Sequence, residues 1–268
     1  MTGHSPLLPE KTNPFTDELA LQNRACFAYR SNELACISTL GRAAPPSVQT
    51  VHDDFRAFIT EPTYPCVGAR AALLSGNYWL GVYNEMGSAG ATAGLAHDLF
   101  NFVQHQPSFK SNFTTFVACF TPPAPSDELE FEALLWQQLQ SLHDLDRQFH
   151  AWDAAASADP ASPYFSYSFA ERAFFIVGLS GVQSRLARRF AWPTLIFNAH
   201  HQFERLRAQN QYQRLQQMIR QREIALQGNI NPNLCDFGTA SEARQYAGRA
   251  VEETWRCPLH VTDKEQAS

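Results

Sequence analysis

Two apolar stretches decide the fold class: YWLGVY at residues 78–83 and FTTFVACF at residues 113–120. Both are short and rich in aromatic and β-branched residues, which predicts buried strands. Between them, the segment 86–94 is rich in glycine and alanine, and the apolar spacing over residues 95–103 predicts a helix. A strand, a helix and a second strand in this order are typical of a sheet covered by helices.

The same mixture of elements continues on both sides of these stretches. Apolar spacing and turn residues predict helices at 48–59, 66–74, 127–150, 200–208 and 212–226, and strands at 174–179 and 193–197. We therefore expect a single α/β or α+β domain with a small mixed sheet of four or more strands flanked by helices. The domain is expected over residues 46–262, after an irregular N-terminal segment at 1–45 and before a short tail at 263–268.

Composition narrows the class of protein. The chain has 268 residues, with 44% apolar and 18% charged residues, as expected for a globular protein, and its net charge of −5 does not favour nucleic acid as a partner. No apolar run resembles a signal peptide or a membrane span, so we expect a cytoplasmic enzyme without a membrane partner. The six cysteines form no CxxC pair, which argues against a zinc cluster.

The run YPCVGAR at residues 64–70 carries the strongest chemical signal. Pro65 suits the entry to a helix, and a cysteine at that point faces unpaired backbone N–H groups and the positive end of the helix dipole. Both effects lower the pKa of a thiol. Cys66 is therefore a candidate heme-iron ligand or nucleophile, and the alternative is a buried thiol that acts as a small hydrophobic residue.

Several stretches between residues 64 and 260 resemble the YqcI/YcgG family in sequence and order. They lie at 64–66, 174–179, 184–190, 193–198, 202–204, 224–232, 241–246 and 255–260. The characterised members of this family, among them the arginine N-hydroxylase of D-cycloserine biosynthesis and the pre-guanitoxin N-hydroxylase, are heme-dependent N-hydroxylases of guanidino groups. The resemblance spans roughly residues 50 to 260. It implies a heme b monooxygenase that hydroxylates a guanidino or amine nitrogen of a small amino-acid-like substrate such as arginine.

Given this resemblance, Cys66 is the first choice for the axial ligand of the heme iron, because a thiolate ligand favours O–O cleavage. His200, at the end of a predicted strand, is the second choice, and its neighbour His201 is an alternative. His97 and His260 are weaker candidates.

The densest basic cluster is Arg185, Arg188 and Arg189. Arginine binds carboxylates in a bidentate manner, so this cluster is expected to hold the heme propionates. The alternative is a basic face exposed to solvent.

A cationic substrate nitrogen needs carboxylates to bind it. Glu85 and Glu242 are the candidate catalytic residues, and Asp236 and Asn231 join them as candidate substrate-binding residues, with Gln227 as a further polar contact. An internal ion pair with Arg244 is the alternative role of Glu242.

The resemblance also implies reaction partners and leaves two other functions open. The oxidant is O2 or H2O2, an electron-donor protein is a candidate partner, and a homodimer is a candidate assembly. One alternative is a heme-binding or heme-sensing protein without turnover. The other is a heme-free enzyme with Cys66 as nucleophile and His200 or His97 as base.

Overall fold

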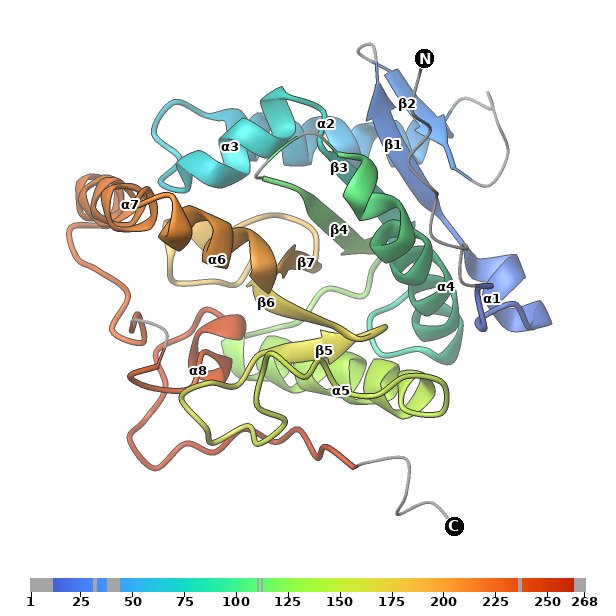
Figure 1. Cartoon of the computed structure of the whole chain (residues 1–268). Helices are drawn as coiled ribbons and strands as arrows, with labels where there is room; N and C mark the ends of the chain where they lie inside the picture. Colours follow the sequence, from blue (N-terminus) through green and yellow to red (C-terminus); the bar gives the residue numbers. More distant parts are fainter. Residues whose placement is uncertain are drawn as a thin grey trace, which may run out of the picture.

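The computed structural model describes residues 12–30, 33–37, 44–109, 111, 113–235 and 238–262. Within them, seven strands form one mixed sheet in the order β2-β1-β3-β4-β7-β6-β5 (Figure 1). The strands are β1 (Cys26–Arg30), β2 (Glu33–Cys36), β3 (Tyr78–Tyr83), β4 (Thr115–Phe120), β5 (Tyr167–Phe169), β6 (Arg172–Leu179) and β7 (Thr194–Ala199). Only β3 and β4 pair in parallel among these strands.

Helices cover both faces of the sheet. They are α1 (Glu18–Asn23), α2 (Pro46–Thr60), α3 (Val67–Leu74), α4 (Ala89–His105), α5 (Glu128–Asp146), α6 (His200–Ala208), α7 (Tyr212–Gln227), α8 (Ala243–Tyr246) and the short 3-10 helices η1 (Gln106–Ser108) and η2 (Leu186–Arg188). Helices α4 and α5 pack on one face, and α2 and α3 pack on the other. The expected single mixed α/β domain is confirmed.

The N-terminal segment differs from the expectation. Residues 1–45 were expected to be irregular, but the described part of this segment contains α1 and the antiparallel pair β1 and β2, which extends the sheet beside β3. The two strands have only five and four residues. Such short segments give little periodicity, and pairing with β3 rather than local sequence fixes their conformation.

Strand β4 contributes side chains to the hydrophobic cores on both faces of the sheet. All six of its residues are buried. Phe116, Ala118 and Phe120 belong to the core under α4 and α5, whereas Val117 and Cys119 belong to the core under α2 and α3. Because successive side chains point to opposite faces, the continuous apolar run is required by burial on both sides.

The glycine-rich segment before α4 allows close helix packing. A Cβ atom at Gly94 would lie 2.1 Å from the backbone oxygen of Asn23, in α1. No side chain fits at that distance, so glycine lets α4 approach the backbone of α1.

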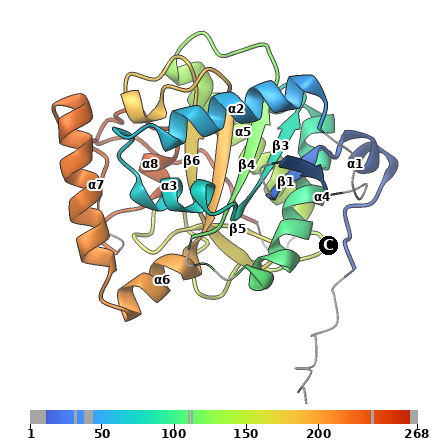
Figure 2. The ribbon, with the colours of Figure 1, turned by 90° about the horizontal axis from the view of Figure 1, so that it is seen from above.

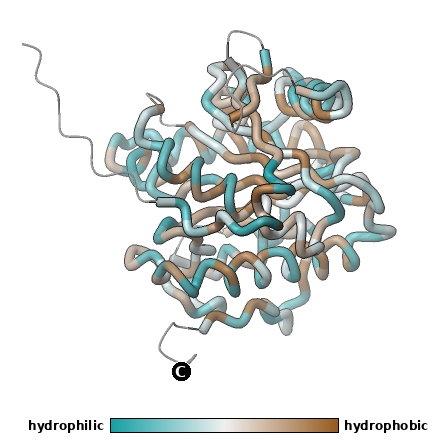
Figure 3. Tube along the Cα trace, turned by 90° about the vertical axis from the view of Figure 1, so that its right-hand side faces the viewer, coloured by the Kyte–Doolittle hydropathy of each residue, from teal (hydrophilic) through white to brown (hydrophobic). Residues whose placement is uncertain are grey.

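Helices α6 and α7 lie at the edge of the molecule, on the side opposite to α1 and α4, in two perpendicular views (Figures 1 and 2). None of the residues of α7, all of which the structure describes, is fully buried. Along the helices of the molecule, hydrophilic and hydrophobic residues alternate within each turn or two, as expected for helices with one buried face (Figure 3). Within the described ranges, no helix has both the length and the apolar composition needed to cross a membrane.

Candidate functional site

A cavity of about 290 Å³ lies on the α2 and α3 side of the sheet, between these helices, α6 and α7. Its wall is mainly apolar and includes Phe55, Ile59, Leu73, Val177 and Ile196. The polar lining residues come from segments far apart in the sequence: Cys66, Arg185, Arg188, His200, Glu223, Asn231 and Glu242. The cavity therefore brings together six of the residues that the sequence singled out: Cys66, Arg185, Arg188, His200, Asn231 and Glu242.

Cys66 lies at the N-cap position of α3, as expected. Its Sγ atom accepts a hydrogen bond from the backbone N–H of Ala69 at 3.4 Å. Burial nevertheless raises the pKa of the Cys66 thiol, and this effect exceeds the lowering by the amide N–H groups of Ala69 and Gly68. The expected lowering of the pKa is therefore wrong, because desolvation of the buried thiol outweighs the effect of the helix N-terminus.

His200 is the first residue of α6 and lines the cavity. Burial lowers its pKa, although Glu204 lies 3.9 Å from Nδ1 and opposes this effect. A neutral imidazole is the form that binds iron. Burial therefore favours the neutral imidazole of His200 near neutral pH.

The other candidate histidines do not line the cavity. His201 has a buried Nδ1 atom without a hydrogen-bond partner among the described residues, and burial lowers its pKa to about 4. His97 is buried on α4, where Nδ1 lies 2.9 Å from Oδ1 of Asp98. His260 is exposed, and its backbone N–H donates to the side chain of Gln140.

The three arginines of the basic cluster have different partners. Arg185 is buried, pairs with Glu223 at 2.5 Å and donates to Asn229, and its Nε atom has no partner among the described residues. Arg188 donates to the backbone carbonyls of Gly178, Gln245 and Tyr246. Arg189 lies outside the cavity and donates to the backbone of its own loop. The three arginines therefore do not act as one cluster, because Arg185 and Arg188 line the cavity and Arg189 does not.

Glu242 immediately precedes α8 and is buried against the cavity. Its Oε1 atom accepts hydrogen bonds from Ser166 at 2.7 Å and Tyr246 at 2.6 Å. Burial raises the pKa of this carboxyl to about 7, although both hydroxyls oppose the shift. Glu242 forms no ion pair with Arg244, which instead lies over the ring of Trp255.

The remaining candidates are dispersed. Glu85 is exposed in the turn after β3, outside the cavity, and Asp236 lies outside the described residues. Asn231 lines the cavity, where its side chain accepts the backbone N–H of Asn233. Gln227 does not line the cavity and instead bonds to the backbone of Ser184 and Leu186.

Sequence reasoning missed the contribution of α7. Its inner face lines the cavity with Tyr212, Leu215, Gln216, Ile219, Arg220 and Glu223. Arg222 fixes this helix to the cysteine loop by donating to the backbone oxygens of Tyr64 and Pro62. The charge pattern of α7 gave a signal, because Arg220 and Arg222 precede Glu223, but a solvent-exposed helix has the same pattern.

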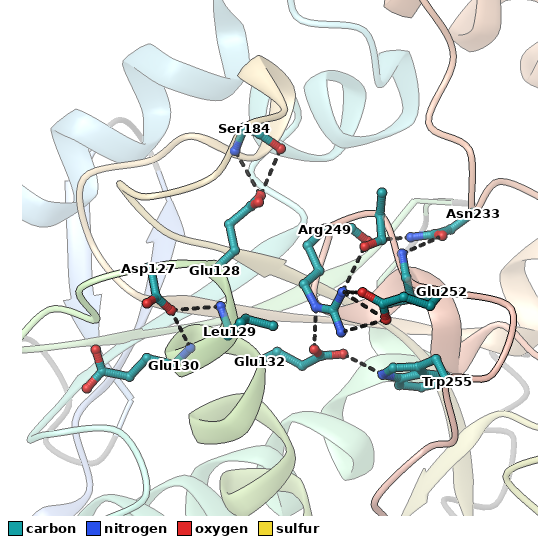
Figure 4. Close-up of polar contacts among 12 residues, drawn as sticks. Asp127, Glu128, Leu129, Glu130, Glu132, Ser184, Asn233, Arg249, Glu252 and Trp255 are labelled. Carbon is teal, nitrogen blue, oxygen red and sulfur yellow. Dashed lines mark hydrogen bonds and ion pairs between the residues drawn. The ribbon is translucent and has the colours of Figure 1, made fainter.

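Two glutamates in the first turns of α5 contact segments that are close in sequence to lining residues of the cavity (Figure 4). The carboxylate of Glu128 accepts both the backbone N–H and the hydroxyl of Ser184, next to Arg185. One turn later, Glu132 pairs with Arg249 and accepts the indole N–H of Trp255. The backbone oxygen of Arg249 accepts from Asn233, which holds the loop that contains Asn231.

The described residues contain no group of three or more histidine, cysteine, aspartate or glutamate side chains suited to hold a metal ion. This finding concerns sites built from several protein ligands. A heme iron needs only one or two of them.

Comparison with known proteins identifies the family. The sequence model of the YqcI/YcgG family matches residues 55–260. The chain belongs to the YqcI/YcgG family. The match covers every described lining residue of the cavity, from Phe55 to Gln245. No curated protein and no solved structure matches the chain.

Proposed function

We propose that this YqcI/YcgG protein is a heme-dependent monooxygenase that N-hydroxylates a guanidino or amine group of a small amino-acid-like substrate, with arginine as the first substrate to test. The observation that carries the proposal is the cavity itself. It combines a thiol, an imidazole, buried arginines and a buried carboxylate within a mainly apolar wall. The family resemblance supplies the type of reaction.

The residues present fit a heme b. Aromatic and aliphatic side chains of α2, α3, β6 and β7 offer an apolar surface, and Cys66 and His200 each offer an atom that binds iron. The Nε atom of Arg185, buried and without a partner among the described residues, is a donor for a propionate. Arg188 contributes positive charge rather than free donors, because backbone carbonyls already accept its N–H groups.

When bound, the heme would supply the activation of dioxygen or peroxide. The mainly apolar wall lowers the polarity of the surroundings, which strengthens the polar interactions within the cavity. Glu242 accepts the cationic nitrogen of the substrate, which requires the ionised carboxylate. Its pKa of about 7 lets this group change charge near neutral pH.

The structure does not favour the heme-free alternative. Among the described residues, Cys66 has no histidine hydrogen-bonded to its sulfur, and its thiol pKa is raised rather than lowered. His97 lies on α4, on the other side of the sheet. A nucleophilic thiol needs an adjacent base or a lowered pKa.

The test is reconstitution of the full chain with hemin, followed by absorption spectra of the ferric, ferrous and ferrous–CO forms. We expect a Soret band and a strongly red-shifted CO band that Cys66→Ser abolishes. Cys257→Ser, which changes a cysteine outside the cavity, is the matched control. An ordinary CO band lost in His200→Ala would assign the ligand to His200, and no hemin uptake would contradict the proposal.

Turnover is tested separately, because heme uptake alone is also expected of a heme-sensing protein. The loaded protein is incubated with arginine and either H2O2 or O2 with a chemical reductant. Mass spectrometry then checks for a product that contains one additional oxygen atom. Heme uptake without product from arginine or simple amines would favour the heme-binding alternative.

A further inference from the structure

The carboxyl group of Glu242 is held on one side only. Both hydroxyl donors, those of Ser166 and Tyr246, reach the same oxygen, Oε1. All three side chains are buried. Among the described residues, Oε2 has no hydrogen-bond partner, although Glu242 lines the cavity. Oε2 is not one of the buried side-chain atoms that lack a partner, so it is accessible from the cavity, where a ligand N–H group can reach it.

Tyr246 is itself fixed by its surroundings. The backbone N–H of Tyr167 donates to the Tyr246 hydroxyl oxygen at 3.1 Å, which leaves the hydroxyl proton for an acceptor. Oε1 of Glu242 is nearer, at 2.6 Å, than the backbone oxygen of Phe174, at 3.3 Å. The ring stacks on Trp136, and Arg188 donates to the Tyr246 carbonyl.

The charged and titratable groups around this carboxyl come from several elements. Arg207 on α6 acts on Glu242 as a positive charge. Glu242 acts in turn on the thiol of Cys235 and on the phenol of Tyr246, and burial raises the pKa of both. Among the described residues, no cationic side chain forms an ion pair with Glu242. The position facing Oε2 therefore suits a cation brought by the ligand.

We infer that Ser166 and Tyr246 are positioning residues: they hold Oε1 of Glu242, so that Oε2 is left to accept an N–H from a guanidinium or ammonium group of the ligand. The class of ligand rests on the proposed function. The orientation of the carboxyl rests on the hydrogen bonds alone.

The experiment follows the Glu242 carboxyl by NMR in protein labelled with 13C-glutamate, and Glu242→Gln assigns its signal. The wild-type midpoint is expected near pH 7. Removal of either hydroxyl, in Tyr246→Phe or Ser166→Ala, removes a donor to the ionised form and raises the midpoint by about one pH unit. Because the two residues lie on different segments, one variant remains informative if the other fails to fold.

The matched controls are Tyr167→Phe and Ser168→Ala. Both residues are buried, and their hydroxyls bond to Leu139 and Asp153 rather than to Glu242. A merely structural role predicts lower stability in all four variants without a change of midpoint. Unchanged midpoints in Tyr246→Phe and Ser166→Ala would overturn the inference, whether or not the protein binds hemin.

The ligand part is tested by calorimetry with L-arginine and its neutral analogue L-citrulline. Below the midpoint, arginine is expected to bind up to about tenfold more weakly for each pH unit that the pH falls, because the carboxylate becomes protonated, and citrulline is expected to show no such dependence. Tyr246→Phe shifts the arginine profile by the same amount as the NMR midpoint. Arginine binding that does not change across the midpoint would overturn the inference. Failure of hemin uptake would instead contradict the proposed function.

Discussion

Helices α5 and α7 are of similar length, with 19 and 16 residues, but they pack in opposite ways. Nine residues of α5 are buried, and the helix also holds the loops of Ser184 and Asn233 through two glutamates. Helix α7 has no fully buried residue, and its inner face lines the cavity. The comparison teaches that an amphipathic pattern does not distinguish a helix that packs on the protein core from one that lines a cavity.

The strongest test of this comparison truncates one apolar residue on each helix. Phe131→Ala in α5 is expected to lower the free energy of unfolding by about 4 kcal/mol, because it leaves a cavity in a closed core. Ile219→Ala in α7, which lines an existing cavity, is expected to cost less than about 1 kcal/mol. Urea unfolding measures both, and equal losses would contradict the comparison.

The next prediction compares Glu132 of α5, which pairs with Arg249, with Glu242 at the cavity, which forms no ion pair with a described residue. The pKa of Glu242 is raised to about 7, so its stabilising contribution is complete below the ordinary carboxyl pKa and is lost as pH rises through 7. A shift of this size corresponds to about 3 kcal/mol. Relative to Glu242→Gln, the wild-type protein is therefore expected to lose about 3 kcal/mol of stability between pH 4 and pH 8. Parallel stability curves would contradict this expectation.

A smaller loss of unfolding free energy is expected when the contact between α5 and the C-terminal segment is removed. Glu132→Gln removes the charge that pairs with Arg249 and is expected to cost about 2 kcal/mol, because the guanidinium stays largely buried. Glu253→Gln, an exposed glutamate of the same segment, is the control. Urea unfolding measures the stability, and similar losses in both variants would show that the pairing does not stabilise this wall.

The smallest effect on stability is expected at the contact that fixes α7. Arg222→Met removes the hydrogen bonds to Tyr64 and Pro62 and is expected to cost about 1 kcal/mol. Amide hydrogen exchange is expected to rise in α7 but not in α5, because only the local opening of α7 becomes easier. Arg214→Met, at an exposed position of α7, is the control. Faster exchange throughout the molecule would contradict a local role.

The sequence predicted the central elements because their apolar patterns are long and continuous. Strand β3 was predicted at its observed bounds, and β4, α6 and α7 were predicted within two residues, but α4 begins six residues before its predicted start. The strands β1 and β2 were missed, because their conformation depends on pairing with β3 rather than on their own sequence.

For the site, residue type and family motif selected Cys66, His200, Asn231 and Glu242, which the structure places on one cavity. The same reasoning did not find Ser166. Serine in a loop carries no signal of its own, and its contact with Glu242 joins residues 76 positions apart. Nor did charge alone show that Arg188 bonds to backbone carbonyls, because such partners have no sequence signature.

The β1 and β2 pair has a further consequence for solubility. These strands precede the region that matches the family, and they cover the outer edge of β3. Without them, the apolar strand YWLGVY would present unpaired backbone N–H and C=O groups to other chains. The antiparallel pair thus prevents other chains from pairing with the edge of β3. A chain shortened to residues 55–260 would keep the described lining residues of the cavity but would expose this edge to strand-to-strand aggregation.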